Sequence, residues 1–325
     1  MAKRVLNLAV WFASGALAAV SVKDDSGATL TLPRPAQRIV SLAPHLTELL
    51  FAAGAGEHVA GVGAFADYPE AAKKLPQVGD SAMLDLERIV ALKPDLLVVW
   101  RDGNSPQQLA KLATLGIPVY ASELGTLADI ASTLRRLSRL AGSEAAAEAR
   151  AAAFEQRLHA LRERYAGRSP LRLFYQVWPR PLLTFNDRHL VIQGLALCGA
   201  KNVFGALAPL VPTVSEEAVV AADPDVIVTG LNGRDAPDGL DAWRRFTRLK
   251  AVRTGALIAV DPDTLHRSSD RIVDGLDQLC AKLDAKLART LGAARHRAAK
   301  AVLVEALEAL GGAESVRARR VRPPA

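Results

Sequence analysis

The residue types that carry catalytic chemistry are scattered along this sequence. The six histidines are His45, His58, His159, His189, His266 and His296, and no two have metal-ligand spacing. The motifs G-x-S-x-G, H-E-x-x-H and Walker A do not occur. Gly54-Ala55-Gly56 begins like a dinucleotide fingerprint, but it follows a predicted helix and lacks the third glycine. We therefore expect no enzyme, no protein-ligated metal and no cofactor of the protein's own.

His45 is the one histidine in a suggestive position. The residues before it predict a short buried strand over 38–41 and a turn over 42–44. A helix is predicted from His45 to Ala53, ended by Gly54. Open α/β sheets bind ligands at the carboxyl edge of their strands. His45 is thus expected either to face a ligand there or to be an ordinary first residue of a helix.

Further along the chain, short apolar strands alternate with helices. Residues 86–92 predict a helix, Pro94 a break, and residues 96–100 and 116–120 two strands. This alternation predicts an α/β fold with parallel sheets that carry helices on both faces.

An internal repeat indicates that there are two such lobes. Residues 85–99 recur without gaps 130 positions later, as residues 215–229. Both copies have the pattern of a helix, Pro-Asp and a strand, and both carry a glutamate at the helix start, Glu87 and Glu217. The shared glutamate favours duplication of a whole lobe over a chance match.

A long helix is predicted between the two copies. Residues 143–165 lack Gly and Pro, and an apolar stripe of Phe154, Leu158, Leu161 and Tyr165 follows one face. Such a helix would be a stiff connector between lobes, or else an ordinary surface helix. We predict an N-terminal lobe over 38–142, the connecting helix over 143–166 and a C-terminal lobe over 170–290.

The ends of the chain hold most of its excess charge. Residues 1–18 read as a secretory signal peptide cut after about Ala18, because a basic start precedes an apolar core too short to span a membrane. Of the formal charge of +7, +2 lies in this segment and +4 in residues 291–325, a basic tail whose composition predicts disorder. A nucleic-acid binder would concentrate its charge on the folded lobes, so we expect no nucleic-acid partner.

The chain has two cysteines, Cys198 and Cys280. In an exported protein such a pair is more often a disulfide than two free thiols.

Several motifs resemble the periplasmic binding proteins for iron and cobalamin that have a helical backbone (class III solute-binding proteins), and they are closest to the cobalamin-binding branch. The motifs are R-I-V-S-L-A-P at 38–44, D-Y-P at 67–69, L-E-R-I-V-A-L-K-P-D-L at 86–96, W-R-D-G-N at 100–104 and C-G-A-K-N-V-F at 198–204. The resemblance covers residues 38–283. It implies two Rossmann-like lobes joined by one long rigid helix, with a ligand cleft between them and both cysteines in the second lobe. It also implies capture of cobalamin or a related corrinoid in the periplasm by a monomer, and delivery to the permease dimer of an ABC transporter.

The resemblance also implies roles for particular residues. Phe65 is similar to an aromatic ligand contact of the family, and Asp263 and Arg267 to a pair that holds the amide groups of the corrin. From the residues alone, Phe65 fits a core position equally well, and Asp263 with Arg267 fits an exposed i,i+4 pair. The resemblance further implies that Glu87 and Glu217 meet arginines of the permease, whereas helix capping would explain either glutamate alone.

Two departures from the family pattern affect the ligand. Ser81 and Val211 stand where the family has tryptophans, and the affinity is expected to depend on local aromatics instead. These are Trp100, Tyr175, Trp178 and Phe185. The alternative is a haem or iron–siderophore binding protein of the same fold. An anionic chelate calls for several basic groups, for which Arg101 and Arg267 are the candidates.

Overall fold

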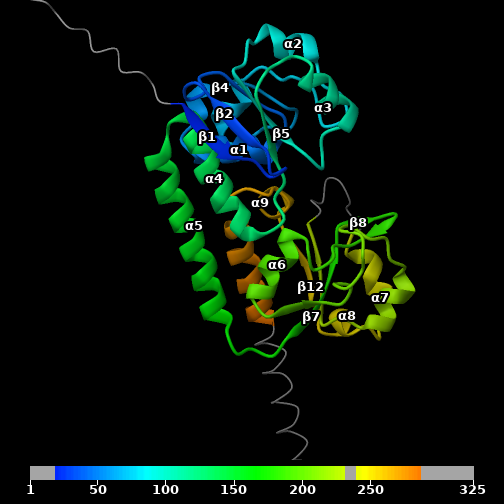
Figure 1. Ribbon diagram of the computed structural model, residues 1–325. Helices are drawn as coiled ribbons and strands as arrows, with labels where there is room; N and C mark the ends of the chain where they lie inside the picture. Colours follow the sequence, from blue (N-terminus) through cyan, green and yellow to red (C-terminus); the bar gives the residue numbers. More distant parts are fainter. Residues whose placement is uncertain (1–18, 231–238, 287–325) are drawn as a thin grey trace, which may run out of the picture. The chain divides into compact units, whose positions relative to one another are not determined.

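The computed structural model describes residues 19–230 and 239–286, which form two compact units (Figure 1). Unit 1 holds the described residues up to His159 together with the segment Arg267–Asp270. Unit 2 holds Ala160–His266 and the described residues from Arg271 onward. The predicted signal peptide and the basic tail lie outside the described residues.

Unit 1 is built on a four-stranded sheet, in which the hydrogen-bonded order is β4-β3-β5-β6 and every pair is parallel. The strands are β3 (Ile39–Ser41), β4 (Val59–Val62), β5 (Leu96–Trp100) and β6 (Val119–Ser122). Ile39 lies opposite Leu96 in the register of the two central strands. These strands are almost wholly buried apolar runs, as expected of a parallel sheet covered on both faces.

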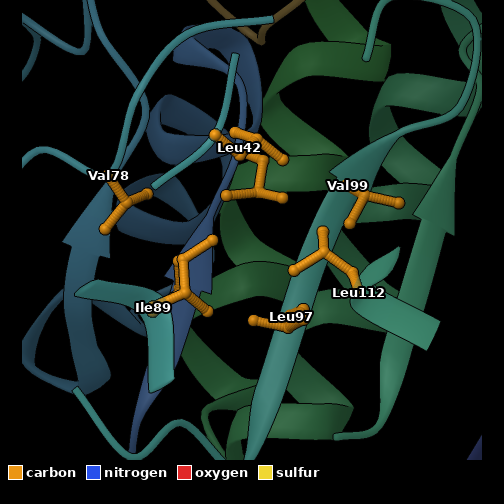
Figure 2. Close-up of a cluster of buried hydrophobic side chains, with 8 residues drawn as sticks. Leu42, Val78, Ile89, Leu97, Val99 and Leu112 are labelled. Atoms are coloured by element: carbon orange, nitrogen blue, oxygen red, sulfur yellow. The ribbon is translucent and has the colours of Figure 1, made fainter. Parts of the chain in front are cut away.

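Helices cover both faces of this sheet. They are α1 (Pro44–Ala52), α2 (Leu86–Ala91), α3 (Pro106–Ala113) and α4 (Leu127–Ala141), with short 3-10 turns at Gly56–His58 and Glu70–Lys74. Figure 2 shows Ile89 of α2 and Leu112 of α3 pointing at Leu97 and Val99 of β5 on one face. The helix α1 contacts β3, β4 and β5, and α4 packs against α1.

Unit 2 repeats this plan. Its parallel sheet has the order β10-β7-β11-β12. The strands are β7 (Leu171–Gln176), β10 (Ala200–Asn202), β11 (Val226–Thr229) and β12 (Leu257–Ala259). The helices are α6 (Leu190–Leu197), α7 (Glu216–Ala222), α8 (Lys250–Arg253) and α9 (Pro262–Leu265), and residues 272–286 are also helical. Unit 2 further contains a 3-10 turn at Asp241–Arg245 and a small hairpin of β8 (Trp178–Pro179) and β9 (Leu182–Leu183).

Counted along the chain, both sheets have the strand order second, first, third, fourth. The predicted α/β class with parallel sheets is therefore confirmed, and the two units share one topology. The long helix α5 (Glu144–Tyr165) crosses the boundary between the units at His159. Phe154, Leu161 and Tyr165 of its predicted stripe are buried.

A hairpin that the sequence did not predict precedes the first sheet strand. Its strands β1 (Val20–Lys23) and β2 (Thr29–Leu32) pair antiparallel on either side of a polar turn. The N–H of Asp25 donates to Ala121 O, and its carboxylate accepts from Glu123 N at 2.7 Å. The polar residues of the turn thus bind the end of β6, which explains why they are not a free leader.

The predicted disulfide between Cys198 and Cys280 is present and lies within unit 2, with 5.7 Å between the Cα atoms. It joins the end of α6 to the helical segment 272–286. Among the described residues, no helix has the length and apolarity needed to cross a membrane.

Candidate functional site

A pocket of about 220 Å³ opens in unit 1 at the carboxyl ends of its two central strands. It is lined by Leu42, Ala43, Pro44, Ala64, Phe65, Asp80, Ser81 and Trp100. The turn Leu42–Pro44 follows β3, and Trp100 ends β5. In the order β4-β3-β5-β6, the connection from β3 leads to β4 and the connection from β5 leads to β6, in opposite directions along the sheet. The gap between the ends of β3 and β5 is therefore the topological switch point, where open α/β sheets bind ligands.

The indole of Trp100 is fixed at the mouth of this pocket by its own loop. The side-chain oxygen of Asn104 accepts from Trp100 N at 2.8 Å, and its amide nitrogen donates to Leu42 O at 3.2 Å. Asn104 thereby fastens the end of β5 to the turn after β3. Gly103 lies against the indole so closely that a Cβ there would stand 1.9 Å from a ring carbon.

His45 packs against the indole of Trp100. Its ring meets the indole edge-on, with 5.1 Å between centroids and an interplanar angle of 87°. The imidazole is buried and does not line the pocket. Burial, and then the positive charge of Arg267, lower the pKa of His45 to about 4, so the ring is neutral at neutral pH.

Phe65 also lines the pocket. Its side chain is 74% exposed, which is unusual for a large aromatic residue. Its backbone has φ of 65°, in the left-handed region that residues other than glycine rarely occupy. Phe65 is thus held outward, and the alternative interpretation that it packs in the core is wrong.

Arg267 lies in the segment of the chain that belongs to unit 1. Its Nη1 contacts Glu48 Oε1 at 3.2 Å, Asp67 Oδ1 at 2.6 Å and the carbonyl oxygen of Phe65 at 3.3 Å. Only 15% of the side chain is exposed. The guanidinium therefore contacts the turn that carries Phe65.

The remaining predicted ligand contacts belong to unit 2. Trp178 in β8 is partly exposed, and its Nε1 donates to Arg180 O at 3.0 Å. Asp263 is exposed in the first turn of α9. Tyr175 and Phe185, by contrast, are buried, so they pack in unit 2 and leave Trp178 as the exposed aromatic among these three.

In unit 2 the ends of the two central strands are filled by side chains. The Gln176 side chain accepts from Trp243 Nε1 at 2.7 Å and donates to Gly239 O at 2.7 Å. The ring of His266 lies over Gly230, where a Cβ would stand 2.5 Å from it, and accepts or donates a hydrogen bond with Tyr175 at 2.9 Å. The position matched by Trp100 in unit 1 is thus packed and polar here.

The two glutamates of the repeat occupy matching places. Glu87 is the second residue of α2 and Glu217 the second residue of α7, and both are exposed. The helices are capped by the side chains of Asp85 and Ser215. Hydrogen bonds from its own backbone and from Ser215 lower the pKa of Glu217, so it stays ionised.

Two residues of the site were missed from the sequence. Asn104 lies in a motif that was noticed as a whole, and its position after a glycine at a strand end was the available signal. Glu48 is the one acidic residue of a mainly apolar helix, a pattern that predicts a buried charged partner. Among the described residues, no group of three His, Cys, Asp or Glu side chains is placed to hold a metal ion.

Apolar and aromatic side chains make up most of the lining of this pocket, as in binding sites for organic ligands, and Asp80 is the one carboxylate among them. Residues 39–264 match the family model for periplasmic binding proteins. That span exceeds half of the chain, and the chain belongs to this family.

Individual members of this family can also be compared with the chain. The vitamin B12-binding protein of Vibrio cholerae serotype O1 is 37% identical over 254 residues, which cover 78% of this chain and 91% of that protein. The crystal structure of the periplasmic vitamin B12 binding protein BtuF of Vibrio cholerae matches with a TM-score of 0.72 at 36% identity, covering 78% of this chain and 98% of that one. The periplasmic heme-binding protein RhuT from Roseiflexus sp. RS-1 matches with a TM-score of 0.67 at 27% identity, covering 75% and 97%.

Proposed function

We propose that this protein captures cobalamin or a related corrinoid outside the cytosol and delivers it to an ABC importer. The observation that carries the proposal is the 37% identity to a vitamin B12-binding protein over 91% of that protein's length. In this account a signal peptide that ends at about Ala18 directs export to the periplasm and is then removed, and the mature protein acts as a monomer and catalyses no reaction. Cobalamin is its transported ligand, not a cofactor.

The pocket of unit 1 supports this proposal by its size and chemistry. Its volume of about 220 Å³ is below the roughly 300–1,000 Å³ of pockets that enclose a whole drug-sized ligand. It therefore suits one part of a large ligand. Phe65 and Trp100 offer apolar ring faces to the corrin, and Trp178 and Asp263 remain proposed contacts of unit 2.

The ion pairs of the structure favour a corrinoid over haem or a ferric siderophore. Arg101 pairs with Glu123 at 2.8 Å, and Arg267 pairs with Glu48 and Asp67. Both arginines proposed for an anionic chelate are thus already neutralised by carboxylates. Nor does the lining of the unit 1 pocket contain a histidine, tyrosine or cysteine that would bind iron.

Delivery is assigned to Glu87 and Glu217, one on each unit. An exposed carboxylate at the same place in two copies of one motif suits a partner that itself has two equivalent subunits. Arginines of a permease dimer would meet them, and the two contacts together would orient the protein.

Calorimetric titration of the mature protein with cyanocobalamin, haem and a ferric siderophore in parallel tests the proposed function. We expect cyanocobalamin to bind with a dissociation constant in the micromolar range or tighter, and the other two to bind at least about a hundredfold more weakly. Tight binding of haem or the siderophore without binding of cyanocobalamin would contradict the proposal.

A further inference from the structure

Glu48 is a buried carboxylate that the proposed function has not used. It lies on α1, and 2% of the residue is exposed. Its Oε1 accepts from Arg267 Nη1 at 3.2 Å, and its Oε2 accepts from Ser269 Oγ at 2.5 Å. A charge at this depth persists only when it is paired and hydrogen-bonded. Glu48 therefore fixes the segment Arg267–Asp270 on unit 1.

A second ion pair anchors the same segment from another element. The carboxylate of Asp270 is buried and pairs with Arg150 of α5. Both anchors hold the segment that carries Arg267, and the Nη1 of Arg267 contacts the turn of residues 65–67.

That turn is the part of the pocket that most needs outside support. Left-handed backbone at a residue with a Cβ is unfavourable by about 1–2 kcal/mol, and Phe65 also gives up burial of its ring. Within the turn, Asp67 N donates to Phe65 O at 3.0 Å. Arg267 adds a hydrogen bond to the same carbonyl oxygen and an ion pair to Asp67. Both ends of the turn are thus held by one guanidinium.

We propose that Arg267 is a positioning residue that holds Phe65 in its outward conformation, and that Glu48 holds Arg267 in place. The inference rests on the proposed function in so far as Phe65 contacts the ligand. It differs from a direct role of Arg267 at the amide rim of the corrin. In that role the guanidinium would add its own contact to the affinity, whatever residue stands at position 65.

A double-mutant cycle separates the two roles. Cyanocobalamin affinity is measured for the wild type, Phe65→Ala, Arg267→Lys and the combination of both. Lysine keeps the charge near Glu48, but a single ammonium does not reproduce the geometry of the guanidinium. We expect Phe65→Ala to weaken binding about tenfold and Arg267→Lys about fivefold, with less than twofold further loss when lysine is added to Phe65→Ala. A loss of threefold or more in that background overturns the proposal.

Hydrogen exchange without ligand provides a second readout that does not depend on the proposed function. The amides of residues 61–70 should exchange at least about threefold faster in Arg267→Lys and in Glu48→Gln, while those of β5 keep their wild-type rates. Unchanged exchange of residues 61–70 overturns the positioning role, even where cobalamin binds. Failure of the wild type to bind cobalamin would instead reject the proposed function and leave this readout valid.

Control variants guard against loss of folding. Arg135 of α4 likewise pairs with two carboxylates, those of Glu148 and Glu155 of α5, and none of the three residues lines the pocket. Arg135→Lys should change neither affinity nor exchange of residues 61–70, and a change as large as that of Arg267→Lys would remove the specificity of the effect. If Glu48→Gln unfolds, the paired variant Glu48→Gln with Arg267→Gln leaves no unpaired charge at the buried position of Glu48, since Asp67 is half exposed to solvent, and is expected to show the same faster exchange. Wild-type exchange in that pair counts against the proposal.

Discussion

The two units share a backbone plan but differ at the ends of their central strands. Trp100 of unit 1, the last residue of β5, and Gly230 of unit 2, which directly follows β11, hold equivalent positions 130 residues apart. In unit 1 the tryptophan borders an open pocket. In unit 2 the ring of His266 covers the glycine, and Gln176 with Trp243 fills the neighbouring space. Among the described residues, the switch point of unit 1 thus borders a pocket, whereas side chains occupy the corresponding place in unit 2.

Elsewhere the copies agree down to single hydrogen bonds. The side chains of Arg38 and Arg172 donate to the carbonyl oxygens of Leu92 and Ala222, at the ends of α2 and α7. The next residues, Lys93 and Asp223, both have positive φ, of 48° and 38°. The carboxylates of Asp95 and Asp225 then accept from the backbone N–H groups of the same two arginines, at the start of the first strand of each sheet. The difference between the units therefore lies in a few side chains and not in the fold.

The disulfide is a feature of unit 2 alone and should produce the largest difference in stability. It closes a separation of 82 residues, for which the entropic model gives about 4.5 kcal/mol of stabilisation. We expect Cys198→Ser with Cys280→Ser to lower the unfolding free energy of unit 2 by about this amount. Denaturant unfolding followed by hydrogen exchange checks it, with the peptides of β3 and β5 in unit 1 as the internal control. Equal loss of protection in both units would mean that they unfold as one.

Acidic pH should also lower the unfolding free energy of the two units by different amounts. Burial lowers the pKa of His45 in unit 1 to about 4, and that of His189 and His266 in unit 2 to about 3 and about 4. Each folded-state pKa is below the unfolded value near 6.5, so the unfolded state takes up the proton first and stability falls as pH drops below about 6.5. From pH 7 to 5 each histidine should cost about 2 kcal/mol.

Unit 2, with two such histidines, should therefore lose about twice as much stability as unit 1. Exchange-detected unfolding of both units at pH 7, 6 and 5 measures the ratio. The variant His189→Phe should bring the loss in unit 2 close to that of unit 1. A loss in unit 1 equal to that of wild-type unit 2 would show that the buried histidines are not its cause.

The glutamates that the two units share, Glu87 and Glu217, should have a smaller effect, and this effect is on cobalamin uptake. Exposed ion pairs contribute about 0.2–1 kcal/mol each, so Glu87→Ala with Glu217→Ala should reduce cobalamin uptake by cells about tenfold. Cobalamin affinity should not change. The double control Glu57→Ala with Glu144→Ala removes two exposed carboxylates outside the repeat and should take up cobalamin normally. Normal uptake in the Glu87 and Glu217 variant would leave both glutamates as helix-start residues without a docking role.

Local patterns allowed much of this molecule to be predicted. Apolar runs broken by Pro-Asp indicated the parallel strands, the repeat indicated two units, and the cysteine pair indicated the disulfide. The predictions for Phe65, Trp100 and Arg267 came from resemblance to a family, and the ligand contacts themselves remain predictions.

What the sequence did not reveal depends on contacts between distant residues. Glu48 and Arg267 are 219 positions apart, and no local signal in either predicts their pairing. The open pocket depends on Asn104 reaching back to Leu42 over 62 positions. The acidic turn of the hairpin at the start of unit 1 binds the end of β6, 98 positions away. The polar composition of this turn gives no sign of that contact.

The central claim is that the switch point of unit 1 receives the ligand while that of unit 2 does not. Titration of Trp100→Ala and Trp243→Phe with cyanocobalamin, beside the wild type, tests it most directly. Trp100→Ala should bind at least about tenfold more weakly at an unchanged melting temperature, because it removes an aromatic wall. Trp243→Phe should lower the melting temperature and bind as the wild type does. Normal binding by Trp100→Ala, or a loss confined to Trp243→Phe, would contradict the account.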